Sequence, residues 1–296
     1  MLIELKNEQL SVQITDKGAE LQSVYSLLEN REYIWQPGAD IFDGHAPILF
    51  PAAGRIDRSR VLIRGLEYPM NMHGFAKDHI FKVKQADSQY ALLELTADPA
   101  RMRLFPYRFR LQVQYQLESG QLVQTFRVYN DGEDDLFFSL GAHPAFYCPV
   151  VLGETADDYL LRFDQPQNTY RIVLEPGTRL CTDQKIPWLE GDQEIPLTED
   201  FFRDGPILSG GYTADTVTLL SRRSGAGIRM GIQGFPYMTF WGPPQRMPLI
   251  CVEPWCGLSD FKGTKHVWET KPGSNRLEPH EVFTRCLTFS PILQQS

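Results

Sequence analysis

The clearest pattern of apolar and polar positions runs from Arg108 to Leu117. Five apolar side chains alternate there with five polar ones, namely Phe109, Leu111, Val113, Tyr115 and Leu117 with Arg108, Arg110, Gln112, Gln114 and Gln116. Alternation with a period of two predicts a strand with one buried face. Turn-forming residues follow at 118–121, and a second β-rich run at 122–129 ends at Asn130-Asp131-Gly132. The two runs predict an antiparallel hairpin.

Shorter β-type runs recur along the chain, most of them bounded by Gly, Pro, Asn or Asp, whereas helical periodicity is scarce. They lie at 10–15, 61–64, 80–84, 91–96, 136–140, 159–163, 216–220, 228–232 and 281–289. The chain also contains 21 prolines and 23 glycines, which suit short connections. Because each antiparallel sheet has one apolar face to cover, many short strands predict sheets packed face to face. We therefore predict an all-β fold, a large antiparallel β-sandwich.

The organisation of the chain favours one domain that spans residues 1–296. At 296 residues and 42% hydrophobic composition it can bury a large core, and β-sandwiches of this size are often single domains. No internal repeat or linker-like change in composition marks a boundary. The stretch 176–211 is the richest in loop-forming residues, and we expect it to be an excursion over one end of the sandwich.

Charge and the N-terminus narrow the possible partners. The net charge of -8, from 29 Lys+Arg against 37 Asp+Glu, would repel a phosphate backbone, so nucleic acid is not an expected partner. Glu4 and Lys6 interrupt the apolar residues at the start of the chain, which is atypical of a signal peptide or a membrane span. We expect a cytoplasmic protein without a membrane partner, and the oligomeric state is left open.

The cysteines indicate neither a disulfide framework nor a metal centre. They are odd in number and scattered, at Cys148, Cys181, Cys251, Cys256 and Cys286. This pattern fits a reducing compartment. Cys251 and Cys256 form a C-x4-C pair, but no second pair with metal-ligand spacing accompanies it. We interpret them as small buried thiols and expect no metal and no cofactor.

Three apolar-flanked segments each contain one titratable side chain, and these are His73 in 71–76, His143 in 141–146 and Glu253 in 251–257. His143 and Glu253 each precede a proline, which favours an extended backbone and hence a defined side-chain direction. Glu253 also closes the apolar run 249–252, so partial desolvation should raise its pKa towards the working range of a general base. A single histidine beside aromatics is usually a core residue, so the prediction depends on the shared context of all three groups.

Four motifs in order resemble the aldose 1-epimerase (galactose mutarotase-like) superfamily, and most closely its LacX-like branch. They are Phe50-Pro51-Ala52-Ala53-Gly54-Arg55-Ile56, Met72-His73-Gly74-Phe75-Ala76, Gly141-Ala142-His143-Pro144-Ala145-Phe146 and Val252-Glu253-Pro254-Trp255-Cys256-Gly257. The likeness extends to Leu277-Glu278-Pro279-His280 and so covers nearly the whole chain. It implies a galactose mutarotase-like supersandwich that interconverts the α and β anomers of an aldose.

The resemblance also implies roles for individual residues. Glu253 matches the base that takes the proton from the C1 hydroxyl, and His143 matches the acid that protonates the ring oxygen. His73 and Arg55 match the histidine and arginine that bind and polarise the sugar. These roles fit the reaction, because opening a hemiacetal ring requires one proton removed and another delivered.

Further sugar-binding positions follow less directly. The family has an aspartate that binds sugar hydroxyls, and Asp204 in Phe201-Phe202-Arg203-Asp204-Gly205-Pro206 is the candidate by its order along the chain, with an exposed loop carboxylate as the alternative. Trp241 and Trp255 could stack on the apolar face of a pyranose, or they could be packed core residues.

Other functions stay open from the sequence. A carbohydrate-binding or sensing protein could keep the fold without turnover. His73, His143 and Glu253 could instead form a two-histidine, one-carboxylate metal site, although such sites commonly contain a close His-x-Asp/Glu pair. A glycosidase would need a second carboxylate in a comparable context, and none is evident.

The sugar itself could be phosphorylated, which would make the protein a hexose-6-phosphate 1-epimerase. Four arginines, Arg55, Arg58, Arg60 and Arg64, lie close together in the sequence, and guanidinium groups suit phosphate. If residues 61–63 form a strand, however, these arginines could line a solvated face or pair with Asp57.

Overall fold

The hairpin predicted from the alternating run after Arg108 is present. β10 (Phe109–Glu118) and β11 (Gln121–Asn130) pair antiparallel, with Leu117 opposite Leu122. From Phe109 onward every second residue of β10 is buried, up to Leu117. The two-residue turn at 119–120 contains Gly120 at a φ of 72°, a conformation that glycine adopts without steric cost. The prediction of this hairpin is confirmed.

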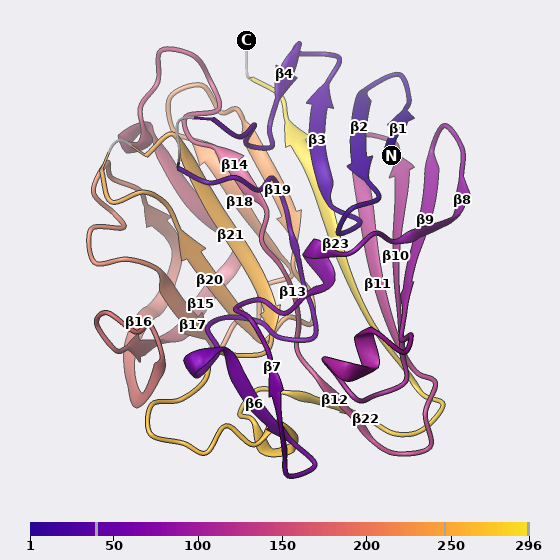
Figure 1. Ribbon diagram of the computed structural model, residues 1–296. Coiled ribbons are helices and arrows are strands. Elements are labelled where there is room, and N and C mark those ends of the chain that lie inside the picture. The colour runs from indigo at the N-terminus through magenta and orange to yellow at the C-terminus, as the bar shows by residue number, and fades with distance from the viewer. Residues whose placement is uncertain (39–40, 246, 295–296) are drawn as a thin grey trace.

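The computed structural model describes residues 1–38, 41–245 and 247–294, so the predicted domain range 1–296 includes residues 39–40, 246 and 295–296 that lie outside the described ones. Most strands belong to one large sheet that curves through the whole molecule (Figure 1). Besides β10 and β11 it contains β5 (Ile48–Leu49), β8 (Lys82–Ala86), β9 (Tyr90–Thr96), β13 (Leu140–Ala142), β14 (Ala145–Tyr147), β15 (Tyr159–Leu174), β16 (Cys181–Pro196), β17 (Ile207–Gly210), β18 (Thr216–Ser221), β19 (Gly227–Gly231), β20 (Tyr237–Trp241), β21 (Leu249–Cys256) and β23 (Val282–Ile292).

The remaining elements are smaller. A four-stranded sheet consists of β1 (Leu2–Lys6), β2 (Leu10–Thr15), β3 (Leu21–Ser26) and β4 (Arg31–Glu32), and two-stranded pairs are formed by β6 (Arg60–Ile63) with β7 (Leu66–Pro69) and β12 (Leu136–Phe138) with β22 (Asn275–Leu277). The helices in the described ranges are short 3-10 turns, η1 (Asp57–Ser59), η2 (Ala76–Asp78), η3 (Arg101–Arg103), η4 (Ala156–Asp158) and η5 (Trp268–Thr270). None of the helices described is long and apolar enough to cross a membrane.

The strand order explains how the core is built. The large sheet runs β5-β13-β21-β20-β17-β15-β18-β19-β23-β11-β10-β9-β8, so β23 joins a half containing β21 to a half containing β10 (Figure 1). The small sheet covers the second half, because Val12 of β2 and Val113 of β10 belong to one buried apolar cluster. Tyr115 also donates a hydrogen bond of 2.7 Å to the carbonyl of Ala19. The predicted all-β fold of packed antiparallel sheets is confirmed.

The expectation for residues 176–211 is wrong in one respect. Much of this stretch is strand, because β16 covers Cys181–Pro196 and pairs with β15, and β17 follows at Ile207–Gly210. Most residues of β16 are exposed. Alternation between apolar and polar residues reports burial of one face, so a strand with little burial leaves no such pattern.

Candidate active site

β21 is buried along its whole length, from Leu249 to Cys256. A strand covered on both faces normally consists of apolar residues, and Glu253 is the exception. Successive side chains point to opposite faces, so Glu253 and Trp255 share one face while Val252 and Cys256 belong to the apolar core on the other. The strand thus places one carboxylate on the wall of a cavity.

A row of paired residues forms this wall of the cavity. Glu253 of β21 lies opposite Thr239 of β20, and Leu208 of β17 lies opposite Thr239 on its other side. Directly paired residues point to the same face of a sheet, and all three line a cavity of about 440 Å³. This volume lies within the range of small-molecule sites, roughly 300–1,000 Å³. Most of the predicted site residues line it, namely Arg55, His73, His143, Trp241, Glu253 and Trp255.

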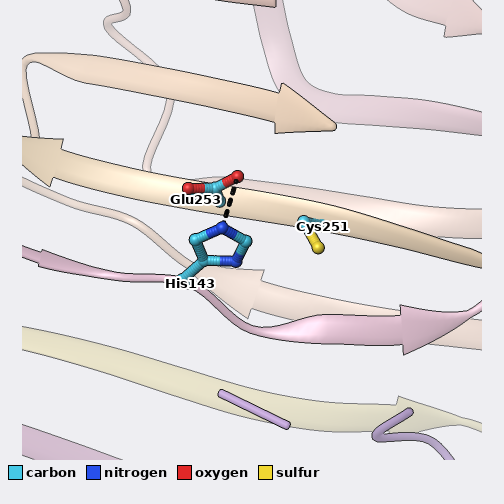
Figure 2. Close-up of side chains that lie close together, drawn as sticks. All are labelled: His143, Cys251 and Glu253. Atoms are coloured by element: carbon cyan, nitrogen blue, oxygen red, sulfur yellow. Dashed lines mark ion pairs between the residues drawn. The ribbon is translucent and has the colours of Figure 1, made fainter. Parts of the chain in front are cut away.

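Glu253 and His143 are in contact. His143 Nε2 lies 3.3 Å from Glu253 Oε1, and the two side chains are 12% and 2% exposed. Figure 2 shows the imidazole directed at the carboxyl group. Burial raises the pKa of Glu253 well above its usual range, and the neighbouring indole of Trp255 opposes this effect. Burial also lowers the pKa of His143 to about 4.

The two pKa directions are consistent with each other. Removing water disfavours the charged form of both groups, so the first proton bound by the pair goes to Glu253 and the second to His143. Between the lowered pKa of His143 and the raised pKa of Glu253 the pair therefore holds one proton. Across the 3.3 Å contact that proton can move to His143, which leaves a carboxylate base beside an imidazolium acid.

His73 is held in a defined protonation form. The backbone N–H of Gly54 donates to His73 Nδ1 at 3.2 Å. In return, the backbone N–H of His73 donates to the Gly54 carbonyl at 3.1 Å. Burial, with the charge of His143 as a secondary cause, lowers the pKa of His73 well below its usual value. A neutral ring that accepts at Nδ1 carries its hydrogen on Nε2. His73, whose ring lies edge-on to His143 at 5.4 Å, therefore offers a donor to a ligand.

The first two sequence motifs interlock at this point. The Phe50 carbonyl accepts hydrogen bonds of 3.0 Å from the N–H groups of Phe75 and Ala76. Gly74 has a φ of 71°, and a Cβ at this position would overlap the Phe50 carbonyl. Only glycine combines that backbone conformation with so close an approach. Residues 50–54 and 73–76 consequently form one unit that positions His73.

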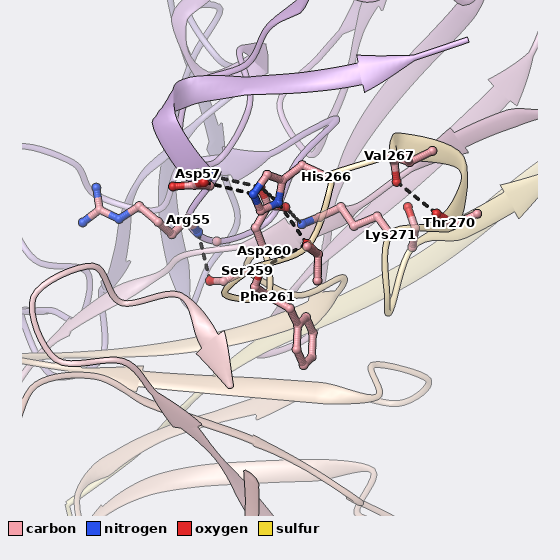
Figure 3. Close-up of polar contacts among 12 residues, drawn as sticks. Arg55, Asp57, Ser259, Asp260, Phe261, His266, Val267, Thr270 and Lys271 are labelled. Atoms are coloured by element: carbon pink, nitrogen blue, oxygen red, sulfur yellow. Dashed lines mark hydrogen bonds and ion pairs between the residues drawn. The ribbon is translucent and has the colours of Figure 1, made fainter. Parts of the chain in front are cut away.

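The backbone of Arg55 is held by the segment that follows β21 (Figure 3). Its N–H donates to Ser259 Oγ at 2.9 Å, and its carbonyl accepts from the Asp260 N–H at 2.8 Å. Ser259 and Asp260 come shortly after Glu253 in the chain. The backbone of Arg55 is therefore tied to the segment that directly follows the strand carrying the carboxylate.

A buried charge cluster supports this connection. The Asp260 carboxylate accepts from the Asp57 N–H at 2.9 Å, forms an ion pair with Lys271, and lies 3.2 Å from His266 Nδ1. His266 Nε2 is in turn 3.0 Å from Asp57 Oδ2. Asp260 and Lys271 are 3% and 8% exposed. The sequence carries no spacing that would reveal this cluster, because its members meet only after β21 has placed 259–260 beside 55–57.

Aromatic rings complete one side of the cavity. Phe42 stacks on His143, with ring centroids 5.0 Å apart and planes inclined by 12°. Trp241 lies beside Phe42 at 5.9 Å, and Trp255 lies edge-on to His73 at 5.7 Å. Phe42 was not expected from the sequence, since it follows no motif and reaches His143 from a distant loop.

Asp204 does not lie where the sequence argument expected it. Its neighbours Arg203, Gly205 and Pro206 line the cavity, whereas Asp204 is exposed and is not among the lining residues. Its backbone carbonyl accepts a hydrogen bond of 2.9 Å from Arg179 Nη1. The carboxylate of Asp204 is thus not brought to the other predicted residues.

The arginines considered for phosphate binding separate in space. Arg58, Arg60 and Arg64 pair with Asp57, Glu67 and Asp134 and do not line the cavity. Arg55 does line it. Two arginines from elsewhere in the sequence, Arg179 and Arg203, line it as well.

The geometry also bears on metal binding. Potential ligand atoms of His143, Cys251 and Glu253 lie within 4.8 Å of one another. The metal site considered from the sequence had His73 in place of Cys251. Burial raises the pKa of the Cys251 thiol well above its usual range. Metals bind the thiolate rather than the thiol, so this environment favours a neutral side chain over a ligand.

Comparisons with known proteins point to one family and fold. The family model for aldose 1-epimerase matches residues 1–277. The plasmid form of protein LacX from Lactococcus lactis subsp. lactis is 32% identical over 286 residues, which cover 94% of this chain and 95% of that protein. A galactose mutarotase-related enzyme from Lactobacillus acidophilus superposes with a TM-score of 0.93 at 27% identity, covering 99% of this chain and 98% of that one. A galactose mutarotase-like protein from Lactobacillus casei ATCC 334 gives 0.90 at 31% identity, covering 99% and 100%.

Proposed function

The chain belongs to the aldose 1-epimerase family, and we propose on that basis that it interconverts the α and β anomers of an aldose. One observation carries the proposal. Glu253 and His143 lie 3.3 Å apart on the wall of a cavity that also exposes His73 and Arg55 to a ligand. A carboxylate and an imidazole in contact supply the base and the acid that opening a hemiacetal ring requires.

The reaction uses the single proton of this pair. Glu253, as the carboxylate, takes the proton of the C1 hydroxyl while His143, as the imidazolium, gives its proton to the ring oxygen. The C1–O5 bond breaks and an open-chain aldehyde forms. Rotation about C1–C2 presents the other face of the aldehyde to O5. Ring closure then returns a proton from Glu253 to O1, while His143 takes back the proton of the O5 hydroxyl.

The remaining groups act on the oxygens of the sugar. The Nε2–H of His73 and the guanidinium of Arg55 are donors that can orient the ring and polarise the C1 and O5 oxygens as charge develops. Trp255 and Trp241 offer apolar faces for the ring carbons. The base is largely shielded from bulk solvent, because Glu253 is 1% exposed. In such surroundings a correctly placed donor stabilises developing charge more than it would in water.

Two substitutions test the proposal. Glu253→Gln removes the base and His143→Asn removes the acid, and each should lower kcat by about 10²- to 10⁴-fold, the usual contribution of a positioned acid or base. Polarimetry on freshly dissolved α-aldoses, or exchange NMR of the anomeric protons, measures the rate. The exposed variant Lys262→Met serves as a control for handling and folding. Full activity in both site variants would show that this pair is not the catalytic one.

A further inference from the structure

The cavity is rich in positive charge although the chain as a whole is acidic. The net charge is -8, yet Arg55, Arg179 and Arg203 line the cavity, and Glu253 is the one carboxylate among its described lining residues. Sugar hydroxyls both donate and accept hydrogen bonds, whereas phosphate and carboxylate oxygens only accept. A lining with three guanidinium groups and no carboxylate other than the base therefore matches an anionic ligand better than a neutral one.

Arg179 is the most constrained of these arginines. It lies in the turn between β15 and β16 with a φ of 62°, a conformation that residues other than glycine adopt at a cost. The turn is closed by a hydrogen bond of 2.9 Å from the Arg179 N–H to the Glu175 carbonyl. Its guanidinium donates to the Asp204 carbonyl at 2.9 Å. The backbone and the head group are thus both fixed before any ligand binds.

Gly205 makes this placement possible. Its φ is 97°, and a Cβ at this position would overlap the guanidinium of Arg179. Within the described residues, the ion pairs include neither Arg179 nor Arg55, whereas Arg203 pairs with Asp200 at the surface. Two guanidinium groups consequently face the cavity without a carboxylate that neutralises them.

The position of Arg179 fits one end of a six-carbon sugar. Glu253, Thr239 and Leu208 are paired across adjacent strands, so Leu208 lies two strand spacings, roughly 10 Å, from Glu253. Gly205 and Pro206 lead into β17 at that end of the row, and Arg179 contacts Gly205. In a pyranose C6 is attached to C5, on the other side of the ring oxygen from C1, and a charged group at C6 extends outward beyond C5. A sugar with C1 at Glu253 and C5 towards β17 would bring that charged group towards Arg179.

Thr239 provides a separate sign of a ligand between these two ends. It is 4% exposed, and its Oγ1 has no hydrogen-bond partner within the part of the chain that the structure describes. An unsatisfied buried hydroxyl carries a cost that a ligand hydroxyl would remove. From one end of the cavity to the other, the ligand therefore meets the carboxyl group of Glu253, the hydroxyl of Thr239 and the guanidinium of Arg179.

We propose that the substrate is an aldohexose with an anionic group at C6, and that Arg179 binds this group. The shared chemistry is an oxyanion, which either a 6-phosphate or a C6 carboxylate supplies. The identity of the reaction rests on the proposed function, but the binding of the anion does not, so the two can be tested apart.

The experiment compares a neutral hexose, its 6-phosphate and the corresponding uronic acid, in the gluco and galacto series. Calorimetry measures binding and exchange NMR of the anomeric protons measures turnover, both in a buffer without phosphate. For the wild type, kcat/KM and affinity should favour a charged sugar over the neutral one by about tenfold or more. Whether the phosphate or the carboxylate gives the larger preference identifies the oxyanion.

Variants then assign the preference to Arg179. In Arg179→Gln the ratio of charged to neutral kcat/KM should fall by about 10- to 100-fold, mainly through KM, because a hydrogen bond to a charged group is lost. Arg179→Lys, which keeps the charge without the planar fork, should give an intermediate ratio. Gly205→Ala keeps the arginine but displaces it, and should also lower the ratio. Arg60→Gln, an exposed arginine outside the cavity, is the matched control.

The outcomes separate the two proposals. The anion site would be overturned if the wild type preferred the neutral hexose. It would also be overturned if the ratio of charged to neutral kcat/KM were unchanged in both Arg179→Gln and Gly205→Ala. Either result would leave the epimerase proposal standing. Tight binding of a charged sugar that depends on Arg179, without turnover of any sugar tested, would support the anion site and count against the epimerase proposal.

Discussion

At the scale of single residues, the contact between Glu253 and His143 predicts how kcat/KM depends on pH. An ordinary glutamate and histidine would hold one proton between them, as a charged pair, only from about pH 4 to about pH 6.5. Here burial raises the pKa of Glu253 and lowers that of His143 to about 4, so the one-proton pair persists over a wider range. The carboxylate–imidazolium form is the minor of the two one-proton forms, because burial disfavours both charges.

We therefore expect kcat/KM to depend on pH with one fall on the acid side and one at higher pH. It should fall below about pH 4, where the pair binds a second proton, on His143, and Glu253 can no longer act as a base. It should fall again above the raised pKa of Glu253, because the pair then has no proton to deliver. Initial rates at constant ionic strength, with circular dichroism to confirm folding at each pH, give the profile. An acid-side fall centred near pH 6.5, the ordinary pKa of histidine, would contradict the lowered pKa of His143.

His143 also affects stability, with a definite sign. Between pH 6.5 and about 4 the unfolded chain protonates this histidine and the folded chain does not, so acidification removes stability within that window. The difference corresponds to about 3 kcal/mol in full, at about 1.4 kcal/mol per pH unit. His143→Asn should lose correspondingly less stability than the wild type between pH 7 and pH 4.5. Urea unfolding at both values measures this, with the exposed His280→Asn as the control.

At the scale of elements, strands with one buried face could be predicted and others could not. The β10–β11 hairpin follows from alternation that burial imposes on Phe109 to Leu117. β16 gives no such signal, because most of its residues are exposed and hydrogen bonding to β15 defines it. Pairing partners far apart in the sequence cannot be obtained from local periodicity.

The candidate site divides in a similar way. His143 and Glu253 stand out because each precedes a proline and adjoins an apolar run, and the family motifs supply their roles. Phe42 and Arg179 carry no local signal, since each reaches the cavity from a loop whose course depends on distant contacts. Sequence neighbours also mislead, because Arg60 is close to Arg55 in the chain but lies outside the cavity.

The segment after β21 provides a test at this scale. Lys271 and Asp260 form a buried ion pair, and removing one partner leaves a charge without compensation. Lys271→Met should therefore cost about 3–5 kcal/mol in the free energy of unfolding. It should also raise KM more than it lowers kcat, because the Arg55 backbone is bound to 259–260 while Glu253 lies within β21. Denaturant unfolding and steady-state kinetics measure the two effects.

An exposed pair offers a close comparison. Lys262 and Glu175 also form a lysine–carboxylate ion pair, but the Lys262 side chain is 62% exposed. Lys262→Met should cost no more than about 1 kcal/mol, since water screens such pairs. Equal losses in Lys271→Met and Lys262→Met would contradict a supporting role for the buried cluster.

At the scale of the whole molecule, the site depends on a sheet that runs through both halves. The strands β21, β20 and β17, which line the candidate site, lie in one half, and the hairpin that packs against the N-terminal sheet lies in the other. β23 is hydrogen-bonded to β19 on one side and β11 on the other, which makes it the connection between the halves (Figure 1). A single hydrophobic cluster extends from β2 and β10 to β20 and β21. The predicted single domain can be tested through this strand.

Leu287 of β23 is fully buried in that cluster. Leu287→Ala should cost about 2–5 kcal/mol, since truncating a buried leucine removes apolar contacts and leaves a cavity. If the halves unfold together, far-UV circular dichroism and tryptophan fluorescence should give one coincident transition in the wild type, and both should shift equally in the variant. Trp241 and Trp255 report from the half that contains the candidate site, whereas far-UV dichroism averages over all strands. The exposed Thr284→Val on the same strand should change the midpoint little. Two separated transitions, with only one of them moved by Leu287→Ala, would divide the chain into two domains and make the catalytic half independent of the N-terminal sheet.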